Sequence, residues 1–279
     1  MVSIIILSYN TSELLEKCLN SVYANTKSDF EVIVVDNASE DDSSQMIKKK
    51  FTKVKLIESK KNLGFASGVN LGAKSAQGEY ILLLNSDTLL EDNSIGIMVD
   101  YLKQQSDVAI LGGRLDNKDG STSKSFDSFY NLPKLVNMLI RDKHREKVDV
   151  KKPIRVDWVS GGFMMIRKNT FEKLGGFDEK FFMYIEDMEL CFRASKENFV
   201  THYLPSAHVL HVGQGSSNRS FAIINIYKGV LYFYKKHHTL PEYYLVKSLL
   251  SLKGNLAILL GRITQNTYLV DTYKNALKF

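Results

Sequence analysis

The chain has 279 residues, of which 44% are hydrophobic, so it can bury one large core and carry an appendage. Its formal net charge of +6 suits an anionic substrate or an anionic membrane surface, and nothing beyond this mild basicity indicates nucleic-acid binding. Two cysteines, Cys18 and Cys191, exclude a disulfide framework and lack CxxC spacing, so we expect reduced thiols in a cytosolic protein.

The N-terminus begins with a short apolar run that no positively charged region precedes, which predicts a strand and not a signal peptide. No stretch approaches the ~18 uninterrupted apolar residues of a typical membrane-spanning helix. We therefore expect no span in this sequence.

The first part of the chain alternates between strands and helices. The strands are predicted at Val2–Ser8, Phe30–Val35, Val54–Glu58 and Tyr80–Leu84. Helices are predicted from Thr11 or Ser12, from the polar stretch 39–44, and after a loop within 64–75. This alternation predicts a parallel sheet with helices on both faces.

The apolar run Leu82–Leu84 ends abruptly on Asn85, Ser86 and Asp87. Open α/β sheets bind their ligands at the carboxyl ends of such strands, although Asp87 alone would equally suit a helix cap or turn. Two other strands also end in polar residues, in the sequences SYN and DNAS. Because these ends share one edge of a parallel sheet, we expect them to line one crevice.

The residues at that edge suit a nucleoside diphosphate. Asp36 can accept hydrogen bonds from a base or a ribose, and the glycines in the segment 62–70 allow close approach of phosphate to a helix N-terminus. The spacing fits neither the dinucleotide fingerprint nor the P-loop, while Asp87 is a suitable oxygen ligand for Mg²⁺ or Mn²⁺. The predicted nucleotide-binding residues are Ser8, Tyr9, Asn10, Asp36, Asn62, Gly64, Phe65, Gly68, Asn70, Asn85 and Ser86. The alternative is a capping loop with structural acids.

A second polar cluster follows in the sequence WVSGGFMMIR and in Glu186-Asp187, which opens a helix. Acids favour a helix N-terminus without any catalytic part, but an apolar and aromatic shell around them would tune a carboxylate as a general base. We expect Asp187 and Glu186 to be catalytic. On the acceptor side we expect Trp158, Gly161, Gly162 and Glu186.

The motifs SYN, VVDNAS, NLGFASGVNLG, LLLNSDT, WVSGGFMMIRK, GGFDEKFFMYIEDMELCFR and HVGQGSS occur in this order. Over about residues 1 to 235 the chain closely resembles the inverting family 2 glycosyltransferases of the GT-A fold, in particular a bacterial branch with rhamnosyltransferases. The resemblance implies a sugar-nucleotide donor, a divalent cation and single-displacement transfer with inversion at the anomeric carbon.

By position, the resemblance implies that Asp36 reads the base and that Asn62 and Gly64 lie against the nucleotide. Asp87 closes the family's D-x-D motif, whose first position is Asn85 here, so metal coordination rests more heavily on Asp87. Asp187 resembles the catalytic base. His211 resembles a late metal ligand, and its neighbour His208 is the alternative.

The predicted GT-A domain covers residues 1–226, with a nucleotide-binding half at about 1–115 and an acceptor-side half at about 116–226. The polar stretch 117–128 and the charged stretch 142–152 are either a mobile insertion beside the acceptor or plain solvent-facing connections. Residues 227–279 form an amphipathic helical region that lies on a membrane, packs on the catalytic domain or mediates homodimerisation. Its His237 and His238 are interpreted as a solvated basic patch.

The sequence thus predicts an α/β protein of the GT-A type, with a Rossmann-like, mostly parallel sheet flanked by helices and a C-terminal helical appendage. The predicted function is metal-dependent inverting transfer from a nucleoside-diphosphate sugar, dTDP-rhamnose before UDP-hexose. The acceptor is a glycan or lipid-linked glycan of bacterial cell-surface polysaccharide, and the location is cytoplasmic, with peripheral contact at the inner face of the membrane.

The sequence alone leaves two other functions open. A sugar-nucleotide nucleotidyltransferase usually carries a glycine-rich, basic loop after its first strand, which residues 8–12 lack. A catalytically degenerate carbohydrate-binding protein would be consistent with Asn85 in place of an acid, but intact Asp87, Asp187 and His211 count against it.

Overall fold

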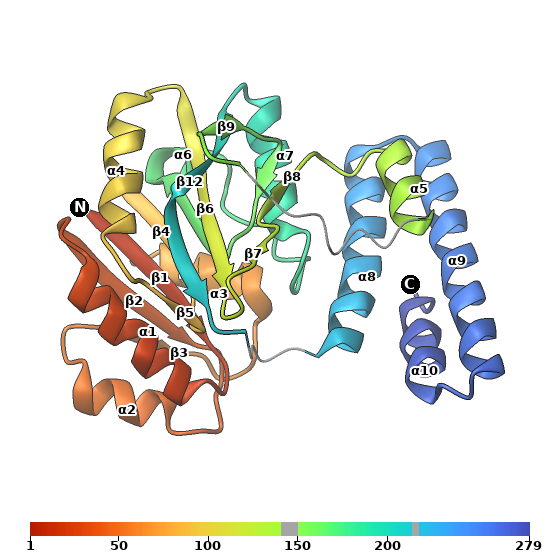
Figure 1. Cartoon of the computed structure of the whole chain (residues 1–279), viewed down its shortest axis with the longest axis horizontal. Coiled ribbons are helices and arrows are strands. Elements are labelled where there is room, and N and C mark those ends of the chain that lie inside the picture. The colour runs from red at the N-terminus through yellow and green to blue at the C-terminus, as the bar shows by residue number, and fades with distance from the viewer. Residues whose placement is uncertain (141–149, 214–217) are drawn as a thin grey trace. The chain divides into compact units, whose positions relative to one another are not determined.

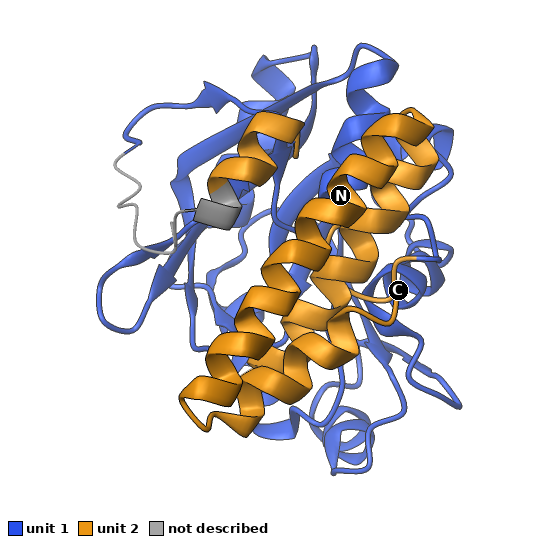
Figure 2. Ribbon diagram, turned by 90° about the vertical axis from the view of Figure 1, so that its right-hand side faces the viewer, with its two compact units in different colours: residues 1–129, 147–180, 187–216 blue, residues 130–146, 181–186, 217–279 orange. Residues whose placement is uncertain are grey.

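The computed structural model describes residues 1–140, 150–213 and 218–279 (Figure 1). The chain divides into two compact units (Figure 2). Unit 1 comprises residues 1–129, 147–180 and 187–216, and unit 2 comprises residues 130–146, 181–186 and 217–279. The division predicted between residues 226 and 227 stays a prediction; helix α8 (Arg219–His237) runs through that point.

The core of unit 1 is a mixed sheet with the strand order β3-β2-β1-β4-β11-β6-β12-β5. Its strands are β1 (Val2–Ser8), β2 (Phe30–Asp36), β3 (Lys55–Glu58), β4 (Tyr80–Asn85), β5 (Thr88–Leu89), β6 (Val108–Asn117), β11 (Phe163–Arg167) and β12 (Val200–His211). Strands β3, β2, β1 and β4 are parallel, as are β6 and β12, and β11 runs antiparallel between β4 and β6. The mostly parallel α/β fold predicted from the sequence is confirmed.

The pairing register brings the polar strand ends together. Ser8 at the end of β1 is opposite Asp36 at the end of β2, and Leu7 is opposite Asn85 at the end of β4. The three polar clusters therefore lie at one edge of the sheet, as the alternation of strands and helices predicted.

Helices cover both faces of this sheet. Unit 1 contains α1 (Ser12–Asn25), α2 (Ser43–Lys50), α3 (Gly64–Ala73), α4 (Ser94–Gln104), α6 (Lys168–Lys173) and α7 (Glu186–Lys196), the last of which begins one residue before the unit boundary. Ile4 and Ile6 of β1 face a core with α1, α2 and α4, whereas Ile5 faces a core with α3, α6 and α7. Side chains alternate between the two faces of a strand, so these continuous apolar strands are buried on both sides. Both cysteines lie in these cores as free thiols, and burial raises the pKa of each to about 12.

Several local predictions differ from the structure. Helix α3 begins at Gly64 itself, so the expected loop is the first turn of the helix. The polar stretch 117–128 contains a turn and two short strands, β7 (Thr122–Ser123), which pairs with β6, and β8 (Phe126–Asp127), which pairs with β10 (Trp158–Val159). Strand β9 (Ile154–Arg155) pairs with β12. Most of the charged stretch 142–152 lies outside the described residues.

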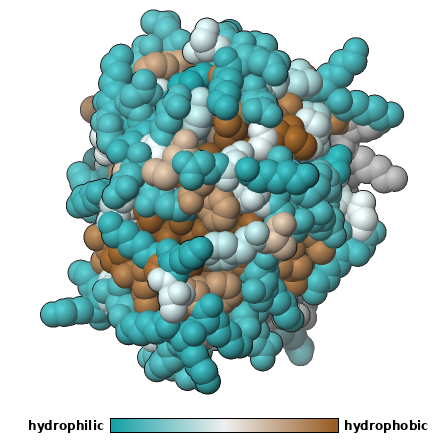
Figure 3. Space-filling view, turned by 90° about the vertical axis from the view of Figure 1, so that its left-hand side faces the viewer, coloured by the Kyte–Doolittle hydropathy of each residue, from teal (hydrophilic) through white to brown (hydrophobic). Residues whose placement is uncertain are grey.

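Part of the surface of unit 1 is visible in Figure 3, where hydrophilic side chains surround smaller patches of hydrophobic ones. Few large apolar side chains of this unit are exposed; Met1 and Tyr23 are the examples, at 42% and 37%.

Unit 2 is helical, with α5 (Leu132–Ile140), α8, α9 (Leu240–Ile263) and α10 (Thr267–Ala276). Helix α9 contacts α5, α8 and α10 through one stripe, in which its residues Val246, Leu250, Gly254, Ile258 and Gly261 are buried. A capping box of Thr239 and Glu242 fixes the start of α9. Near the end of α8, His237 and His238 pack on aromatic rings and are half-buried, which corrects the prediction of a solvated patch.

By length and composition α9 is a candidate for crossing a membrane. The basic residues in its sequence predict instead an amphipathic helix that does not span. Only 22% of its most apolar stretch is buried in the structure. The outward face carries Leu240, Tyr244, Leu245, Leu252, Leu256, Leu259, Leu260 and Ile263. One helix of this length and composition does not establish a membrane span. The exposure of its apolar face to solvent therefore remains to be accounted for.

Candidate active site

The end of strand β2 is tied to the start of helix α3 through Asn37. The Asn37 side chain donates to Oδ1 of Asn62 at 3.1 Å and to the carbonyl of Gly64 at 3.2 Å, and it accepts from the N–H of Leu63 at 2.9 Å. Asn37 is buried, so these bonds fix the loop in place. Asn37 is not among the site residues predicted from the sequence, although Asn37 directly follows Asp36.

Asp36 is buried at the end of β2 and is held by polar groups of the following loop. One carboxylate oxygen accepts from the N–H of Ser39 at 3.2 Å, and the other accepts from the hydroxyl of Ser44 at 2.6 Å. Each oxygen has a second lone pair to offer, so the carboxylate keeps the capacity to accept a ligand hydrogen bond.

The first turn of α3 provides a tight approach for an anion. Gly64 has a φ of 77°, and its N–H donates to Oδ1 of Asn62 at 2.9 Å. A side chain would be strained in this backbone conformation, and a helix N-terminus favours negative charge. Asn62 and Gly64 lie beside the end of β2, and the nucleotide contacts predicted for them and for Phe65 stay predictions.

Ser8 is buried, and its hydroxyl contacts another hydroxyl at the sheet edge. Its hydroxyl lies 3.0 Å from that of Thr11, which donates to Ser86 at 3.1 Å. This chain of hydroxyls links the ends of β1 and β4. Asn10, with a φ of 55°, accepts from the N–H of Glu40, so its amide oxygen also holds a loop. Tyr9, between them in the chain, is half-buried, and the predicted nucleotide contacts of all three residues stay predictions.

Gly68 and Asn70, within α3, also have structural contacts. A Cβ on Gly68 would lie 2.8 Å from the side chain of Leu7, so this glycine permits close packing of α3 on β1. The amide of Asn70 accepts from the N–H of Phe177 at 2.9 Å and donates to its carbonyl at 2.8 Å. Gly68 thus positions the helix, and Asn70 holds the residue that follows the glycine turn at 175–176. The nucleotide contacts predicted for them stay predictions.

Asp87 and His211 meet at the same edge of the sheet. Thr88 in β5 pairs with His211 in β12, which brings Oδ2 of Asp87 to 3.2 Å from Nε2 of His211. The neighbouring carboxylate raises the pKa of His211, and burial opposes that rise. Asp87 is 6% exposed and His211 is half-buried, so the pair is partly shielded from water.

His208, the alternative to His211, lies in a different environment. Its Nε2 is 3.2 Å from Asp92 and its Nδ1 is 3.2 Å from Asp116. The backbone N–H of His208 donates to the hydroxyl of Ser94 at 2.8 Å. Between the two histidines, it is His211 that contacts Asp87.

A divalent cation fits the Asp87 and His211 pair as a partial site. Two neighbouring ligands of an octahedral cation with bonds of ~2.1 Å lie ~3 Å apart, close to the 3.2 Å between these two atoms. No group of three or more histidine, cysteine, aspartate or glutamate side chains suited to a metal occurs among the described residues. If a cation binds at Asp87 and His211, phosphate oxygens and water would be expected among its other ligands, as is usual for nucleotide-bound Mg²⁺.

Gly161 and Gly162 join the end of β4 to the start of α7. The N–H of Asn85 donates to the carbonyl of Gly162 at 3.1 Å, and the N–H of Gly161 donates to Oδ2 of Asp187 at 3.2 Å. A Cβ on Gly161 would lie 3.0 Å from the ring of Phe65. Larger residues at positions 161 and 162 would push apart Asn85, Phe65 and Asp187, which the sequence analysis placed in one site.

Asp187 is the second residue of α7 and is held in a fixed orientation. Its Oδ1 accepts from the N–H of Met188 at 2.7 Å, and its Oδ2 accepts from Gly161. Burial raises the pKa of Asp187 despite these hydrogen bonds. A positioned carboxylate with a raised pKa suits a general base. Glu186, the preceding residue, is only 4% exposed.

Trp158 lies in β10, away from the start of α7 in the chain. Its indole N–H donates to the carbonyl of Ser128 at 3.0 Å, and its ring packs at the border of the core that contains α3 and α7. Its predicted contact with an acceptor stays a prediction.

The central sheet and its flanking helices have the GT-A fold. The fold is similar to that of GalNAc-T7 solved with UDP, GalNAc and Mn²⁺, with a TM-score of 0.63 and 17% identity. That likeness covers 84% of this chain but only 49% of GalNAc-T7, so it shows the shared fold.

The sequence model of "Glycosyl transferase family 2" matches residues 3–175, and that of the "N-terminal domain of galactosyltransferase" matches residues 143–214. The chain belongs to glycosyl transferase family 2. It is 27% identical over 242 residues to the N-acetylglucosaminyl-diphospho-decaprenol L-rhamnosyltransferase of Mycobacterium tuberculosis, covering 77% of each chain. It is 26% identical over 234 residues to the rhamnosyltransferase WbbL of Escherichia coli, covering 79% of this chain and 86% of WbbL.

Proposed function

We propose that this family 2 glycosyltransferase is metal-dependent and inverting, and that it transfers a sugar from a nucleoside-diphosphate sugar to a hydroxyl of a glycan. dTDP-rhamnose is the first candidate donor and a UDP-hexose the second. The two rhamnosyltransferases at 26% and 27% identity support this order. The product would be part of a bacterial cell-surface polysaccharide.

The observation that carries the proposal is the pairing of Asp87 with His211 at the sheet edge that also holds Asp36. Asp87 and His211 would hold Mg²⁺ or Mn²⁺, which as a Lewis acid would neutralise the charge of the departing nucleoside diphosphate. Asp36 would accept a hydrogen bond from the base or ribose. Asn62 and Gly64 would lie against the diphosphate.

Asp187 would remove the proton of the attacking acceptor hydroxyl. As the bond from the acceptor oxygen to the anomeric carbon forms, the bond from that carbon to the diphosphate oxygen breaks, and the diphosphate leaves with the electron pair. A single displacement of this kind inverts the anomeric carbon. The hydrogen bonds from Gly161 and Met188 would keep the carboxylate aimed at the hydroxyl.

We further propose that the acceptor is a glycan linked to a lipid diphosphate, and that the enzyme acts at the cytoplasmic face of the membrane. The mycobacterial relative is an N-acetylglucosaminyl-diphospho-decaprenol L-rhamnosyltransferase, which supports a lipid-linked substrate. Residues 218–279 carry nine lysines and arginines against two acids, a formal charge of +7 next to the exposed apolar face of α9. A positively charged helical segment with an exposed apolar face suits an anionic bilayer surface better than a homodimer contact, where the charges of two copies would repel.

Calorimetry with dTDP, UDP and GDP tests the proposed function. We expect one of the three to bind in the presence of Mn²⁺ or Mg²⁺ and to bind much more weakly after chelation. The substitution of Asn85 for an acid favours one other candidate, a carbohydrate-binding protein that has lost catalysis. Such a protein would show no metal-dependent nucleotide binding.

A further inference from the structure

A short segment of the helical unit leads directly into the candidate base. Residues 181–186 belong to unit 2, whereas Lys180 before them and Asp187 after them belong to unit 1. Glu186 is the last residue of the segment and the first of α7, and Asp187 follows it. The backbone of the segment 181–186 therefore determines the direction in which the chain enters α7.

Two residues of this segment have a strained backbone. Tyr184 and Ile185 have φ angles of 69° and 72°, in the left-handed region that favours glycine. Among the residues that the structure describes, they are the only two non-glycine neighbours in the chain that both have a positive φ. Ile185 is also β-branched, which makes it an outlier in this conformation. Strain of this kind persists only where the surrounding packing imposes it, and it is concentrated at functional sites.

The packing that imposes this conformation comes from helix α8. Ile185 is only 6% exposed, and it lies against Gly229 of that helix. A Cβ at position 229 would lie 2.8 Å from Cγ1 of Ile185 and 3.3 Å from the carbonyl oxygen of Tyr184. Because Gly229 has no side chain, both strained residues can approach the helix closely.

Aromatic rings of α8 hold the rest of the segment. The ring centroids of Phe181 and Tyr232 lie 4.9 Å apart, and those of Phe182 and Phe221 lie 6.1 Å apart, both in edge-to-face arrangements. Phe221 also lies 6.5 Å from the ring of Tyr184. Aromatic pairs at these separations attract each other beyond the effect of burial alone. The segment is thus fixed to α8 along most of its length.

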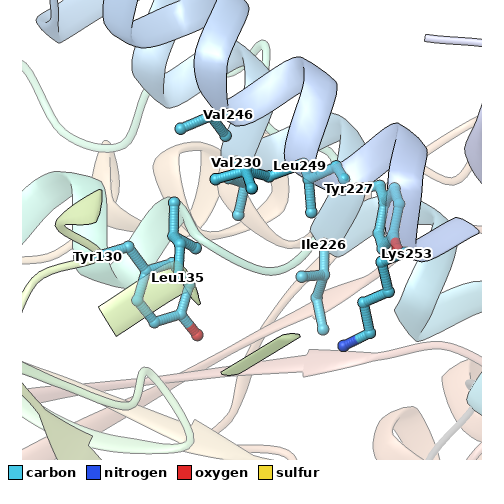
Figure 4. Close-up of a pocket in the computed structure, with 9 residues that line it drawn as sticks. Tyr130, Leu135, Ile226, Tyr227, Val230, Val246, Leu249 and Lys253 are labelled. Atoms are coloured by element: carbon cyan, nitrogen blue, oxygen red, sulfur yellow. The ribbon is translucent and has the colours of Figure 1, made fainter. Parts of the chain in front are cut away.

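Helix α8 is itself fixed by the other helices of unit 2. Its residues Ile226 and Val230 line an apolar pocket together with Leu249 of α9 (Figure 4). Its Tyr227 packs edge-to-face on Tyr273 of α10, with the ring centroids 5.9 Å apart. The segment 181–186 is therefore held by a helix that has little freedom to move within its unit.

We propose that Tyr184, Ile185 and Gly229 are positioning residues, through which helix α8 fixes the start of α7 and so orients the carboxylate of Asp187. The hydrogen bond from Gly161 to Asp187 needs α7 to begin where the segment places it. This inference rests on the proposed function, in which Asp187 is the base. It adds a dependence of turnover on the helical unit.

The test compares two glycine-to-alanine variants of the full-length protein. Gly229→Ala crowds Ile185. Gly254→Ala is the matched control, because a Cβ there would also lie 2.8 Å from a side chain, that of Leu277, elsewhere in unit 2. Turnover of the donor sugar with Mn²⁺ gives kcat, calorimetry gives the Kd of the nucleoside diphosphate, and thermal melts give stability.

We expect Gly229→Ala to lower kcat at least roughly tenfold, while its nucleotide Kd stays within about twofold of the wild-type value. Gly254→Ala should keep the wild-type kcat, although the Tm of both variants should fall. Equal losses of kcat in the two variants would overturn the proposal. A loss of nucleotide affinity in Gly229→Ala as large as its loss of kcat would do the same.

Variants of Ile185 supply a second test if Gly229→Ala does not fold. Ile185→Gly can adopt a φ of 72° without strain, but it removes the side chain that packs on α8. Its kcat should therefore fall at least roughly tenfold with nucleotide affinity retained. Ile185→Val keeps both branches at Cβ and should restore a kcat near that of the wild type. A wild-type kcat in Ile185→Gly, or an equal loss in Ile185→Val, would contradict the proposal.

Asp187→Asn separates this inference from the proposed function. If Asp187→Asn turns over like the wild type, the proposed base is wrong and the inference fails with it. If Asp187→Asn is inactive while Gly229→Ala and Ile185→Gly turn over like the wild type, the inference fails and the proposed function stands. An inactive Asp187→Asn with slow Gly229→Ala and fully active Gly254→Ala is the expected result.

Discussion

Nε2 of His211 lies 3.2 Å from Oδ2 of Asp87, although the two residues are far apart in the chain. The pairing of β5 with β12 creates this contact, and the N–H of Val212 reinforces it by donating to the carbonyl of Asp87 at 2.8 Å. The pairing of these strands thus places a carboxylate next to an imidazole. Both side chains would be in place to ligate a divalent cation at this edge of the sheet.

The first prediction concerns Asp87. Asp87→Asn preserves the shape but removes the charge, so it should weaken Mn²⁺-dependent nucleotide binding by at least roughly ten- to a hundredfold. Calorimetry with and without Mn²⁺ measures the effect. The structure offers a matched control, because Asp92 also lies 3.2 Å from a histidine, His208. Asp92→Asn should bind like the wild type, and similar losses in both variants would mean that Asp87 is merely structural.

The second prediction assigns the base. Asp187→Asn should lower turnover by roughly 10²- to 10⁴-fold while donor affinity stays near that of the wild type, because the proton is transferred only in the reaction. Glu186→Gln should lower turnover less than Asp187→Asn does, and it should raise the KM for the acceptor more. Steady-state kinetics of both variants decides between them. An inactive Glu186→Gln with an active Asp187→Asn would reverse the two roles.

The third prediction concerns stability and pH. Burial raises the pKa of Asp187, so the folded state holds this proton more tightly than the unfolded state does. The stability that the protonated group contributes is fully present below its unfolded pKa and is lost as pH rises through the higher folded value. Asp187→Asn cannot lose that proton, so at pH 7 it should have a higher Tm than the wild type. The difference should shrink below about pH 4, near the unfolded pKa of an aspartate. Thermal melts at both pH values measure it, and a lower Tm of the variant at pH 7 would contradict the account.

The fourth prediction concerns the exposed face of α9. Leu256 and Leu260 are 57% and 55% exposed, so the double variant Leu256→Glu, Leu260→Glu should fold normally. It should lose binding to phosphatidylglycerol vesicles in a sedimentation assay, because two acids replace apolar contacts next to an anionic surface. Tyr23→Glu, which places an acid at an exposed position of unit 1, is the control. Unchanged binding of the double variant would exclude α9 as the contact.

The sequence predicted the sheet edge well, because buried strands that end in polar residues are a strong local signal. Strand β1 has the predicted bounds, and β4 extends the prediction by one residue, Asn85. Hydrogen bonds between distant segments could not be predicted. Ser8 and Asn70 have polar side chains in the expected segments, but their contacts with Thr11 and Phe177 follow from the packing of the chain. The choice between His208 and His211 likewise depends on which histidine pairs with β5.

The packing inside unit 2 could also not be predicted from the sequence. The periodic leucines of α9 predict a helix, but they do not tell which of them are covered by α5 and α8. The left-handed backbone of Tyr184 and Ile185 likewise depends on packing against α8, which the sequence does not show.

Donor hydrolysis followed by ¹H NMR tests the central claim most directly. The wild-type protein is incubated with dTDP-rhamnose, UDP-hexoses or GDP-sugars in Mn²⁺, with water as the acceptor. The account predicts that one donor releases a sugar whose first-formed anomer is inverted, and that chelation of Mn²⁺ or the Asp187→Asn substitution stops the release. Release of the retained anomer, or equal release from the Asp187→Asn variant, would contradict it.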